Sequence, residues 1–209
     1  TSITYTATGR GYVFEYSGYG MIRDVSMRVG MVGTFDLGDE VASTELTYQD
    51  TGVLSDAPRY NTRTERWLTT SETSATPTTV TAAYTYTRST VGTDEVNSVT
   101  YPSGLVVKTT SGGDSAQPDF GRVKKVESLN GSTLLHEVTY SYGTAGGGEP
   151  QVTSVVTKTK KDNGDPAQTR RVDYEYWSTF GRVKNVREYE SGSVRRRTYF
   201  EYQDCTGYT

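Results

Sequence analysis

Residues 120–126 read Phe-Gly-Arg-Val-Lys-Lys-Val and residues 180–186 read Phe-Gly-Arg-Val-Lys-Asn-Val, so the chain contains nearly the same segment twice, sixty positions apart. Each copy then passes through a turn at a glycine and closes on an aromatic-x-Tyr triplet, at 140–142 and 200–202. Repetition at a fixed period indicates a modular fold. A unit of strand, turn and strand buries its face only against its neighbours, so we expect an extended sheet of serial β-hairpins.

The composition also favours β-structure. Apolar residues make up 33% of the 209 residues, and there are 17 tyrosines and 22 glycines. Tyrosine and threonine pack well on a pleated, half-buried surface, and the glycines are spread as turn residues. We predict an all-β fold of serial antiparallel β-hairpin repeats that form an extended, twisted or spiralling sheet. The prediction is one domain over 1–209, with weak sub-boundaries near 50–60 and 143–150.

Weaker copies of the repeat unit are found elsewhere in the chain. Residues 12–16 close on Phe-Glu-Tyr, and residues 20–25 repeat the opening as Gly-Met-Ile-Arg-Asp-Val. Two stretches are predicted as loops, 69–79 from its Ser/Thr-rich composition and 143–150 from its glycines. Further strand pairs are predicted within 25–48, for 63–68 with 80–86, for 96–101 with 105–108, and for the segment from 152 with 172–176.

The Asn-Gly pair at 130–131 predicts a type I′ hairpin turn, which requires a positive φ at both residues. This interpretation is preferred to an N-glycosylation site at Asn130-Gly131-Ser132. Val123 and Val126 fall on opposite faces of a regular strand, so either a β-bulge or burial on both faces is expected there.

The closing tyrosines are expected to form an aromatic ladder. Residues two apart in a strand share a face, so Tyr140 projects with Tyr142, and Tyr174 with Tyr176. Each ring buries apolar area and keeps a hydroxyl for a hydrogen bond. The residues predicted to carry the repeat structurally are Gly20, Tyr84, Tyr86, Tyr101, Gly104, Gly121, Arg122, Val123, Gly131, Tyr140, Tyr142, Tyr174, Tyr176, Gly181, Arg182, Val183, Gly192, Phe200 and Tyr202.

These motifs resemble the Rhs/YD-repeat family. The resemblance lies in the two Gly-Arg-Val-x-x-Val openings, the glycine turns, the aromatic-x-Tyr closings and Tyr-Pro-Ser-Gly at 101–104. The Tyr-Asp dipeptide that names the repeat does not follow the closings, where Gly143, Trp177 and Gln203 stand instead. The resemblance implies hairpin strips that spiral into shells, which enclose an effector in bacterial members and belong to adhesion ectodomains in teneurins.

The bacterial shells of this family often end in a self-cleaving Asp-Pro-x-Gly motif. Residues 165–168 read Asp-Pro-Ala-Gln and lack its glycine, so neither that protease nor a toxin domain is expected here. The resemblance therefore implies a wall segment of a shell, in a protein of bacterial origin.

Residues with catalytic or metal-binding chemistry are few. His136 is the only histidine and has no His or Cys partners for a zinc or copper site, so a structural role is expected. Cys205 is the only cysteine and is expected to be a free thiol or an inter-subunit contact. The acidic turns at 36–40 and 162–165 are interpreted as solvated turns rather than calcium sites. We expect no enzymatic activity, no catalytic residues, no cofactor and no metal.

The charge pattern does not favour nucleic acid. The net charge is −3 and the pI near 5.3, and adjacent residues of Arg195-Arg196-Arg197 point to opposite faces of a strand. No apolar run reaches transmembrane length.

Three functions remain open at this point. The leading hypothesis is a non-enzymatic wall or scaffold segment of an extracellular or cell-surface protein, paired with other β-repeat segments. The first alternative is a self-assembling fibre subunit whose copies join through edge strands. The second is a module that binds glycans or a cell-surface partner, with tyrosines and Trp67 or Trp177 stacked on sugar rings.

Overall fold

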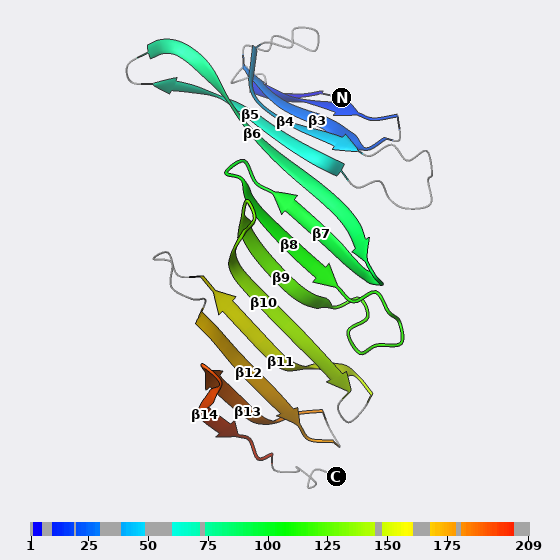
Figure 1. Cartoon of the computed structure of the whole chain (residues 1–209). Coiled ribbons are helices and arrows are strands. Elements are labelled where there is room, and N and C mark those ends of the chain that lie inside the picture. The colour runs from blue at the N-terminus through cyan, green and yellow to red at the C-terminus, as the bar shows by residue number, and fades with distance from the viewer. Residues whose placement is uncertain are drawn as a thin grey trace. The chain divides into compact units, whose positions relative to one another are not determined.

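The computed structural model describes residues 2–5, 10–18, 20–29, 39–48, 60–71, 74–144, 148–160, 168–178 and 181–202 (Figure 1). Every regular element in these ranges is a strand, which confirms the all-β prediction. The strands are β1 (Ser2–Tyr5), β2 (Arg10–Tyr16), β3 (Ile22–Val29), β4 (Asp39–Tyr48), β5 (Tyr60–Ser71), β6 (Ser74–Val91), β7 (Asp94–Thr100), β8 (Leu105–Ser111), β9 (Val123–Asn130), β10 (Thr133–Thr144), β11 (Pro150–Thr159), β12 (Gln168–Tyr176), β13 (Val183–Glu190) and β14 (Ser193–Tyr199).

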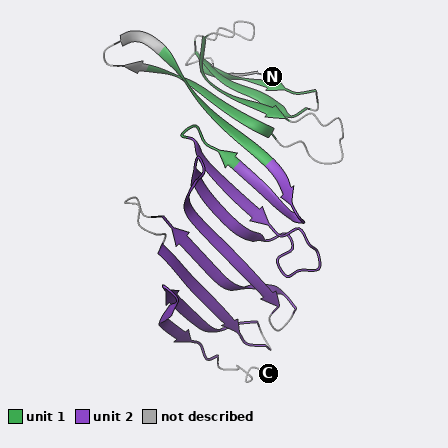
Figure 2. Cartoon of the chain, viewed as in Figure 1, with its two compact units in different colours: residues 1–87, 99–103 green, residues 88–98, 104–209 purple. Residues whose placement is uncertain are grey.

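The strand order in the sheet is the order of the strands in the sequence, so the topology is an antiparallel meander. The chain divides into two compact units, which Figure 2 colours separately. Unit 1 comprises residues 1–87 and 99–103, and unit 2 comprises residues 88–98 and 104–209. Of the sub-boundaries predicted near 50–60 and 143–150, residues 50–59 and 145–147 lie outside the described residues.

The two sequence copies are also structural copies. In the β9–β10 hairpin, Leu134 pairs with Leu129 and His136 with Ser128, which leaves Leu135 as a bulge. In the β13–β14 hairpin, each pair lies sixty positions later in the same register, and Arg195 is the bulge. The repeat in the sequence therefore specifies strand register and bulge position as well as strand content.

The turn between β9 and β10 differs from the prediction. Asn130 pairs with Thr133, so the central residues are Gly131 and Ser132, and of these only Gly131 has a positive φ, of 58°. The predicted type I′ turn on Asn130-Gly131 is therefore wrong, because glycine at the first central position is the type II′ arrangement. The second copy does meet the type I′ requirement, since φ is positive at both central residues, Ser191 (50°) and Gly192 (83°).

This turn geometry separates two adjacent substitutions. Gly131→Ala is expected to lower the free energy of unfolding by about 1–2 kcal/mol, because an L-residue resists the left-handed region. Asn130→Ala is expected to change it by less than about 0.5 kcal/mol, since Asn130 is an ordinary exposed strand residue. Urea unfolding of both variants measures the difference, and equal losses would contradict the type II′ assignment.

The predicted loop at 69–79 is also wrong. β5 continues to Ser71 and β6 begins at Ser74, with Thr69 paired to Thr78. Threonine's β-branched side chain favours the extended backbone, which explains why a composition typical of loops forms strands here. The neighbouring prediction is confirmed, because Arg63 pairs with Tyr84 within the β5–β6 hairpin.

The register sorts the side chains of unit 2 onto two faces. Tyr140 lies opposite Val155, which lies opposite Val172 on the next strand. Residues that lie opposite each other on adjacent strands project to the same side of the sheet, so Tyr140, Val155 and Val172 share one side. We call this side the apolar face; its members are Val107, Val123, Val126, Val138, Tyr140, Tyr142, Val152, Val155, Val172, Tyr174, Tyr176, Val183 and Val186.

Burial on the apolar face is shared among many side chains, each of which is half-buried. Among the described residues, the only buried hydrophobic side chain is Ala82. The opposite side of unit 2, the polar face, carries charged residues such as Glu137 and Lys158, which form an ion pair of 2.7 Å. Stability therefore comes from a surface distributed along the strands, as expected for repeats that contact their neighbours.

Candidate functional site: the repeat junctions

We call the first strand of a repeat unit its opening strand and the strand that ends in the aromatic-x-Tyr triplet its closing strand. A repeat junction is the place where an opening strand begins, beside the end of the preceding segment. Three junctions start with a glycine of positive φ: Gly20 (75°), Gly121 (67°) and Gly181 (61°). Each glycine donates its N–H to the carbonyl of one earlier residue, whose own N–H donates to the carbonyl of the residue after the glycine. These reciprocal bonds join Gly20 and Met21 to Ser17, Gly121 and Arg122 to Gly112, and Gly181 and Arg182 to Trp177, at 2.7 to 3.0 Å.

The second residue of the opening strand is a bulge. Val123 pairs with Ser111 and Lys125 with Thr110, so Lys124 has no partner in the register. The bulge brings Val123 and Val126 onto the same face, which confirms the bulge interpretation of their odd spacing. The same shift occurs at the β12–β13 and β2–β3 pairs, where the bulged residues are Lys184 and Arg23.

The closing tyrosines bind the starts of earlier strands through their hydroxyl groups. Tyr142 donates to the carbonyl of Val123 over 2.8 Å, and Tyr176 donates to that of Val152 over 2.6 Å. Tyr48 makes the equivalent bond to Ile22 in unit 1, at 2.7 Å. Burial raises the pKa of Tyr48, Tyr142 and Tyr176, which keeps each hydroxyl protonated as a donor.

An arginine covers the closing tyrosine in both clear copies. The guanidinium carbon of Arg122 lies 5.9 Å from the centre of the Tyr142 ring, and that of Arg182 lies 5.2 Å from the Tyr202 ring. These distances are within the range of a cation–π contact. The Gly-Arg-Val opening therefore has three assigned roles: a left-handed turn, a cover for the tyrosine and a carbonyl acceptor.

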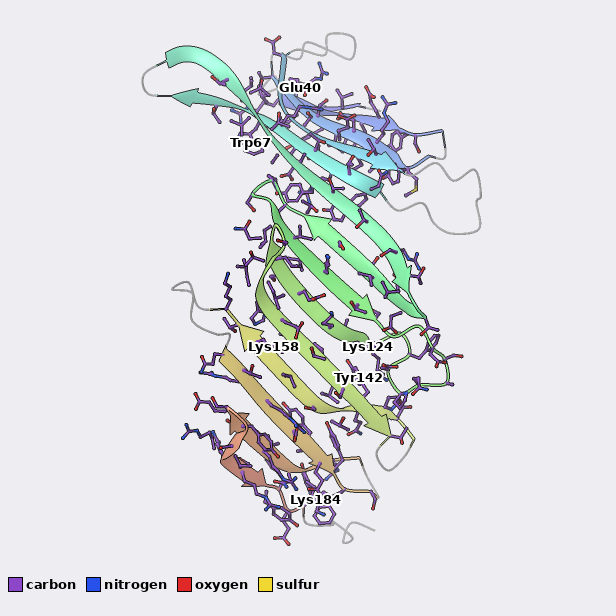
Figure 3. The ribbon with its side chains drawn as sticks, in the orientation of Figure 1. Glu40, Trp67, Lys124, Tyr142, Lys158 and Lys184 are labelled. Atoms are coloured by element: carbon purple, nitrogen blue, oxygen red, sulfur yellow. The ribbon has the colours of Figure 1, made fainter. Side chains whose placement is uncertain are left out.

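The bulged basic residue pairs with a carboxylate at each junction. Arg23 contacts Glu15 at 2.6 Å, and Lys184 contacts Glu175 at 3.3 Å. Each of these glutamates is the middle residue of an aromatic-x-Tyr closing triplet. Lys124, which is labelled in Figure 3, contacts Asp94 at 2.9 Å and also Asp119 at 3.2 Å. The hydrogen bond from Lys124 holds the pKa of the Asp94 carboxyl below its ordinary value.

The lowered pKa of Asp94 predicts a pH dependence. Its contribution to stability is present above the unfolded-state pKa of about 3.9 and is lost as the pH falls through the lower folded-state pKa. Wild type is therefore expected to lose more stability than Lys124→Met when urea unfolding is compared at about pH 6 and about pH 3. Lys160→Met, at an exposed lysine, is the control and should behave as wild type. An unchanged Asp94 pKa in Lys124→Met, measured by NMR titration, would contradict the assignment.

The tyrosines do not form the predicted continuous ladder. Tyr142 lies opposite Val152, and Tyr176 lies opposite Val183, so aromatic and aliphatic strands alternate across the apolar face. The cause is the repeat itself, because opening strands contribute valines and closing strands contribute tyrosines. Direct contacts between tyrosine rings occur instead in unit 1, between Tyr48 and Tyr60 at 6.4 Å, Tyr60 and Tyr86 at 4.9 Å, and Tyr84 and Tyr101 at 5.8 Å. In unit 2 the ring of Trp177 contacts that of Tyr199 at 6.3 Å.

Asn185 is a site residue that sequence reasoning missed. It is 1% exposed and lies in a depression on the polar face that is lined by Asp173, Tyr174, Glu175, Asn185 and Arg187. Its Nδ2 donates to Glu175 over 3.2 Å, and its Oδ1 accepts from Nε of Arg197 over 3.2 Å. The signal in the sequence was the one change between the two quoted segments, where asparagine replaces the lysine at 125. These two hydrogen bonds tie β12, β13 and β14 together.

The remaining predicted residues occupy strands and turns. His136 lies on β10 between Ser128 and Thr159, and Gly104 has a φ of 82° before β8. Phe200 donates its N–H to Lys184 over 2.9 Å. Cys205, the acidic turn predicted at 162–165 and residues 36–38 of the one predicted at 36–40 lie outside the described residues, whereas Asp39 and Glu40 are the first residues of β4.

The three consecutive arginines have separate partners on β13. Arg195 contacts Glu190 at 3.2 Å and Arg196 contacts Glu188 at 3.7 Å, while Arg197 bonds to Asn185. Among the described residues, no group of three or more His, Cys, Asp or Glu side chains is placed to hold a metal ion. Within the same ranges, no helix has the length and hydropathy of a membrane span.

No family model and no curated protein matches this chain. Among solved structures, it is similar to a porin-like protein from Bacteroides uniformis, with 15% sequence identity and a TM-score of 0.30. The similarity covers 90% of this chain and 56% of that protein, so the chain spans about half of its length.

Proposed function

We propose that this chain is a non-enzymatic, structural β-repeat segment of an extracellular or cell-surface Rhs/YD-like protein, where it acts as shell wall or scaffold. The observation that supports the proposal most is that residues 122–142 and 182–202 have the same register, the same bulge position and the same arginine–tyrosine contact. A segment that repeats its backbone pairing in this way extends a sheet by adding units.

The junction chemistry supports the same role. The hydroxyl groups of Tyr48, Tyr142 and Tyr176 and the bulged cations Arg23, Lys124 and Lys184 are all used in contacts within the sheet. These groups fix the position of one hairpin against the next. A wall needs this property, since every added strand must keep the register of the strand before it.

A deletion that respects the period tests the repeat basis of the proposal. Removing residues 123–182 joins Arg122 to Val183, whose surroundings match those of Val123, and should leave a chain with one cooperative unfolding transition. Removing residues 123–152 instead joins Arg122 to Thr153 and loses the opening valine, so this control should be clearly less stable. Equal unfolding of both deletions, measured by circular dichroism and urea, would count against the repeat architecture.

The wall role itself is tested by cryo-electron microscopy of the native assembly that contains this chain. We expect the sheet to continue into neighbouring β-repeat segments. A chain that stands as a separate body, with no β-repeat neighbour, would refute the wall role. An activity that disappears on His136→Ala with folding preserved would refute the non-enzymatic part of the proposal.

Glycan binding is a second candidate, which one observation in unit 1 favours. Trp67 and Tyr12 lie on one row of the sheet, linked through Met27 and Ala42, and both side chains are exposed. Exposed aromatic rings on a flat sheet can stack on sugar rings. A glycan array with wild type and Trp67→Ala tests the idea: hits lost in the variant would support it, and an array without reproducible hits would remove it.

A further inference from the structure

The outer edge of β14 resembles an edge that accepts another strand. β14 stands at one end of the strand order, and in the described part of the chain only β13 pairs with it. β10 has the equivalent position in the first copy, and it is paired on both sides, by β9 and by β11. The question is whether β14 has the features that let β10 bind β11.

β10 and β14 pair with their preceding strands, β9 and β13, in the same way at every position. Both strands have the same register to the preceding strand, the same bulge three positions into the hairpin arm, and an arginine over the closing tyrosine. A bulge on an edge strand often blocks pairing. In β10 it does not, because the carbonyl of the bulged Leu135 accepts a hydrogen bond from Lys160 beyond the end of β11, at 2.8 Å. Arg195 holds the same place in β14.

The backbone groups that β14 presents can be assigned. Phe200 donates its N–H inward to Lys184 on β13, at 2.9 Å. Since strand residues alternate between the two sides, Tyr199 and Arg197 direct their N–H and C=O groups outward. Their counterparts in β10, Thr139 and Glu137, are paired with residues of β11. The outer edge of β14 therefore offers the hydrogen-bonding groups that bind a strand in the first copy.

The arginines of β14 do not occupy this edge. Charged side chains can protect an edge strand from association. Here Arg195 and Arg196 turn back to Glu190 and Glu188 of the same hairpin, and Arg197 bonds to Asn185. The positive charges are therefore paired within the β13–β14 hairpin, and they do not repel an incoming strand that carries no charge.

We propose that the outer edge of β14 binds β1 of a second copy of this chain, antiparallel, so that copies associate head to tail. β1 precedes the closing strand β2 and thus has the place of an opening strand, as β11 has before β12. Directions alternate along the strand order, so β1 of another copy continues the alternation after β14. The segment Ser-Ile-Thr-Tyr at 2–5 contains no charged residue.

This contact joins different surfaces of the two copies, so it is heterologous: each copy can bind one copy through β14 and another through β1, and the assembly grows into a chain or closes into a ring according to the rotation between copies. β1 is only four residues long, so each contact adds a short ladder. The association is expected to be weak and to grow with protein concentration, as in other interactions that add a strand to a sheet edge. The inference goes beyond the proposed wall role, which does not need a second copy.

Sedimentation velocity over a wide range of protein concentrations tests the proposal. Arg197→Pro removes one outward N–H, which an edge strand tolerates in its fold, and should stay at the monomer mass of 23.0 kDa. Arg197→Ala removes the same side chain but keeps the N–H, so it should associate as wild type does. Wild type that is monomeric throughout, or Arg197→Pro that associates like Arg197→Ala, overturns the proposal.

A second variant keeps the test decisive if Arg197→Pro does not fold. A chain without residues 1–5 lacks β1 and should also be monomeric; association equal to wild type would overturn the proposal. Mixed together, the two variants offer one intact β14 edge and one intact β1, so they should form a one-to-one dimer and nothing larger. A monomeric wild type that tolerates deletion of 123–182 would end the self-association proposal and leave the wall role standing.

Discussion

Gly113→Ala is expected to lower the free energy of unfolding by about 3 kcal/mol. A Cβ at this position would lie 1.7 Å from the carbonyl oxygen of Thr93 and 2.7 Å from its carbon. Both atoms belong to the backbone of the β6–β7 turn, so no side-chain rotation relieves the overlap. The loop that carries Gly113 would have to move away from the turn, and the hydrogen bond from its N–H to Asp94 would weaken.

Gly18→Ala is the matched control for this substitution. No atom lies within 4 Å of a Cβ at Gly18, and its φ is not in the left-handed region. The control should change the free energy of unfolding by less than about 0.5 kcal/mol. Urea unfolding at neutral pH measures both variants. Similar values for the two glycines would show that the loop and the turn do not touch as described.

Tyr176→Ala is expected to cost about 3 kcal/mol, at the lower end for large aromatic truncations because the ring is half-buried. Tyr176→Phe isolates the hydroxyl: it keeps the ring but leaves the carbonyl of Val152 without its 2.6 Å donor, at a cost of about 1–2 kcal/mol. The difference between the two variants separates ring burial from the hydrogen bond. Chemical unfolding of both proteins gives the two values.

Tyr199→Phe is the control for loss of a hydroxyl, since Tyr199 is 53% exposed on the edge strand. It should change stability by less than about 0.5 kcal/mol. Tyr142→Phe should repeat the result of Tyr176→Phe, because its hydroxyl has the equivalent acceptor in Val123. No measurable change at Tyr142 and Tyr176 would mean that the rings add little to the wall and would strengthen the glycan-binding candidate.

Several features of the fold were predictable because they depend on neighbouring residues. The hairpins at 123–142 and 183–202 follow from short turns between segments of β-forming residues. The odd spacing of Val123 and Val126 predicted either a bulge or burial on both faces, and the register shows the bulge, at Lys124. The strand residues 69–71 and 74–79 were missed because composition suggested a loop, whereas pairing between β5 and β6 decided the conformation.

The site was predictable in its residues but not in their contacts. The sequence singled out Arg122 and Tyr142, yet nothing local indicated that one covers the other or that the hydroxyl binds Val123. Asn185 was passed over because asparagine in a strand has no distinctive pattern. Its burial and its bonds to Glu175 and Arg197 appear only once three strands are side by side.

The sequence by itself determined the all-β class, the sixty-residue repeat and the order of opening and closing strands, because turn glycines, β-propensity and the repeat are properties of contiguous residues. Only the tertiary structure decided the partner of each tyrosine hydroxyl, the carboxylate beside each bulged cation, and the alternation of valine and tyrosine strands on the apolar face. These depend on register, in which a slip of one residue reverses every side chain of a strand. Register is settled by all neighbouring strands together, so it is not encoded in any one segment.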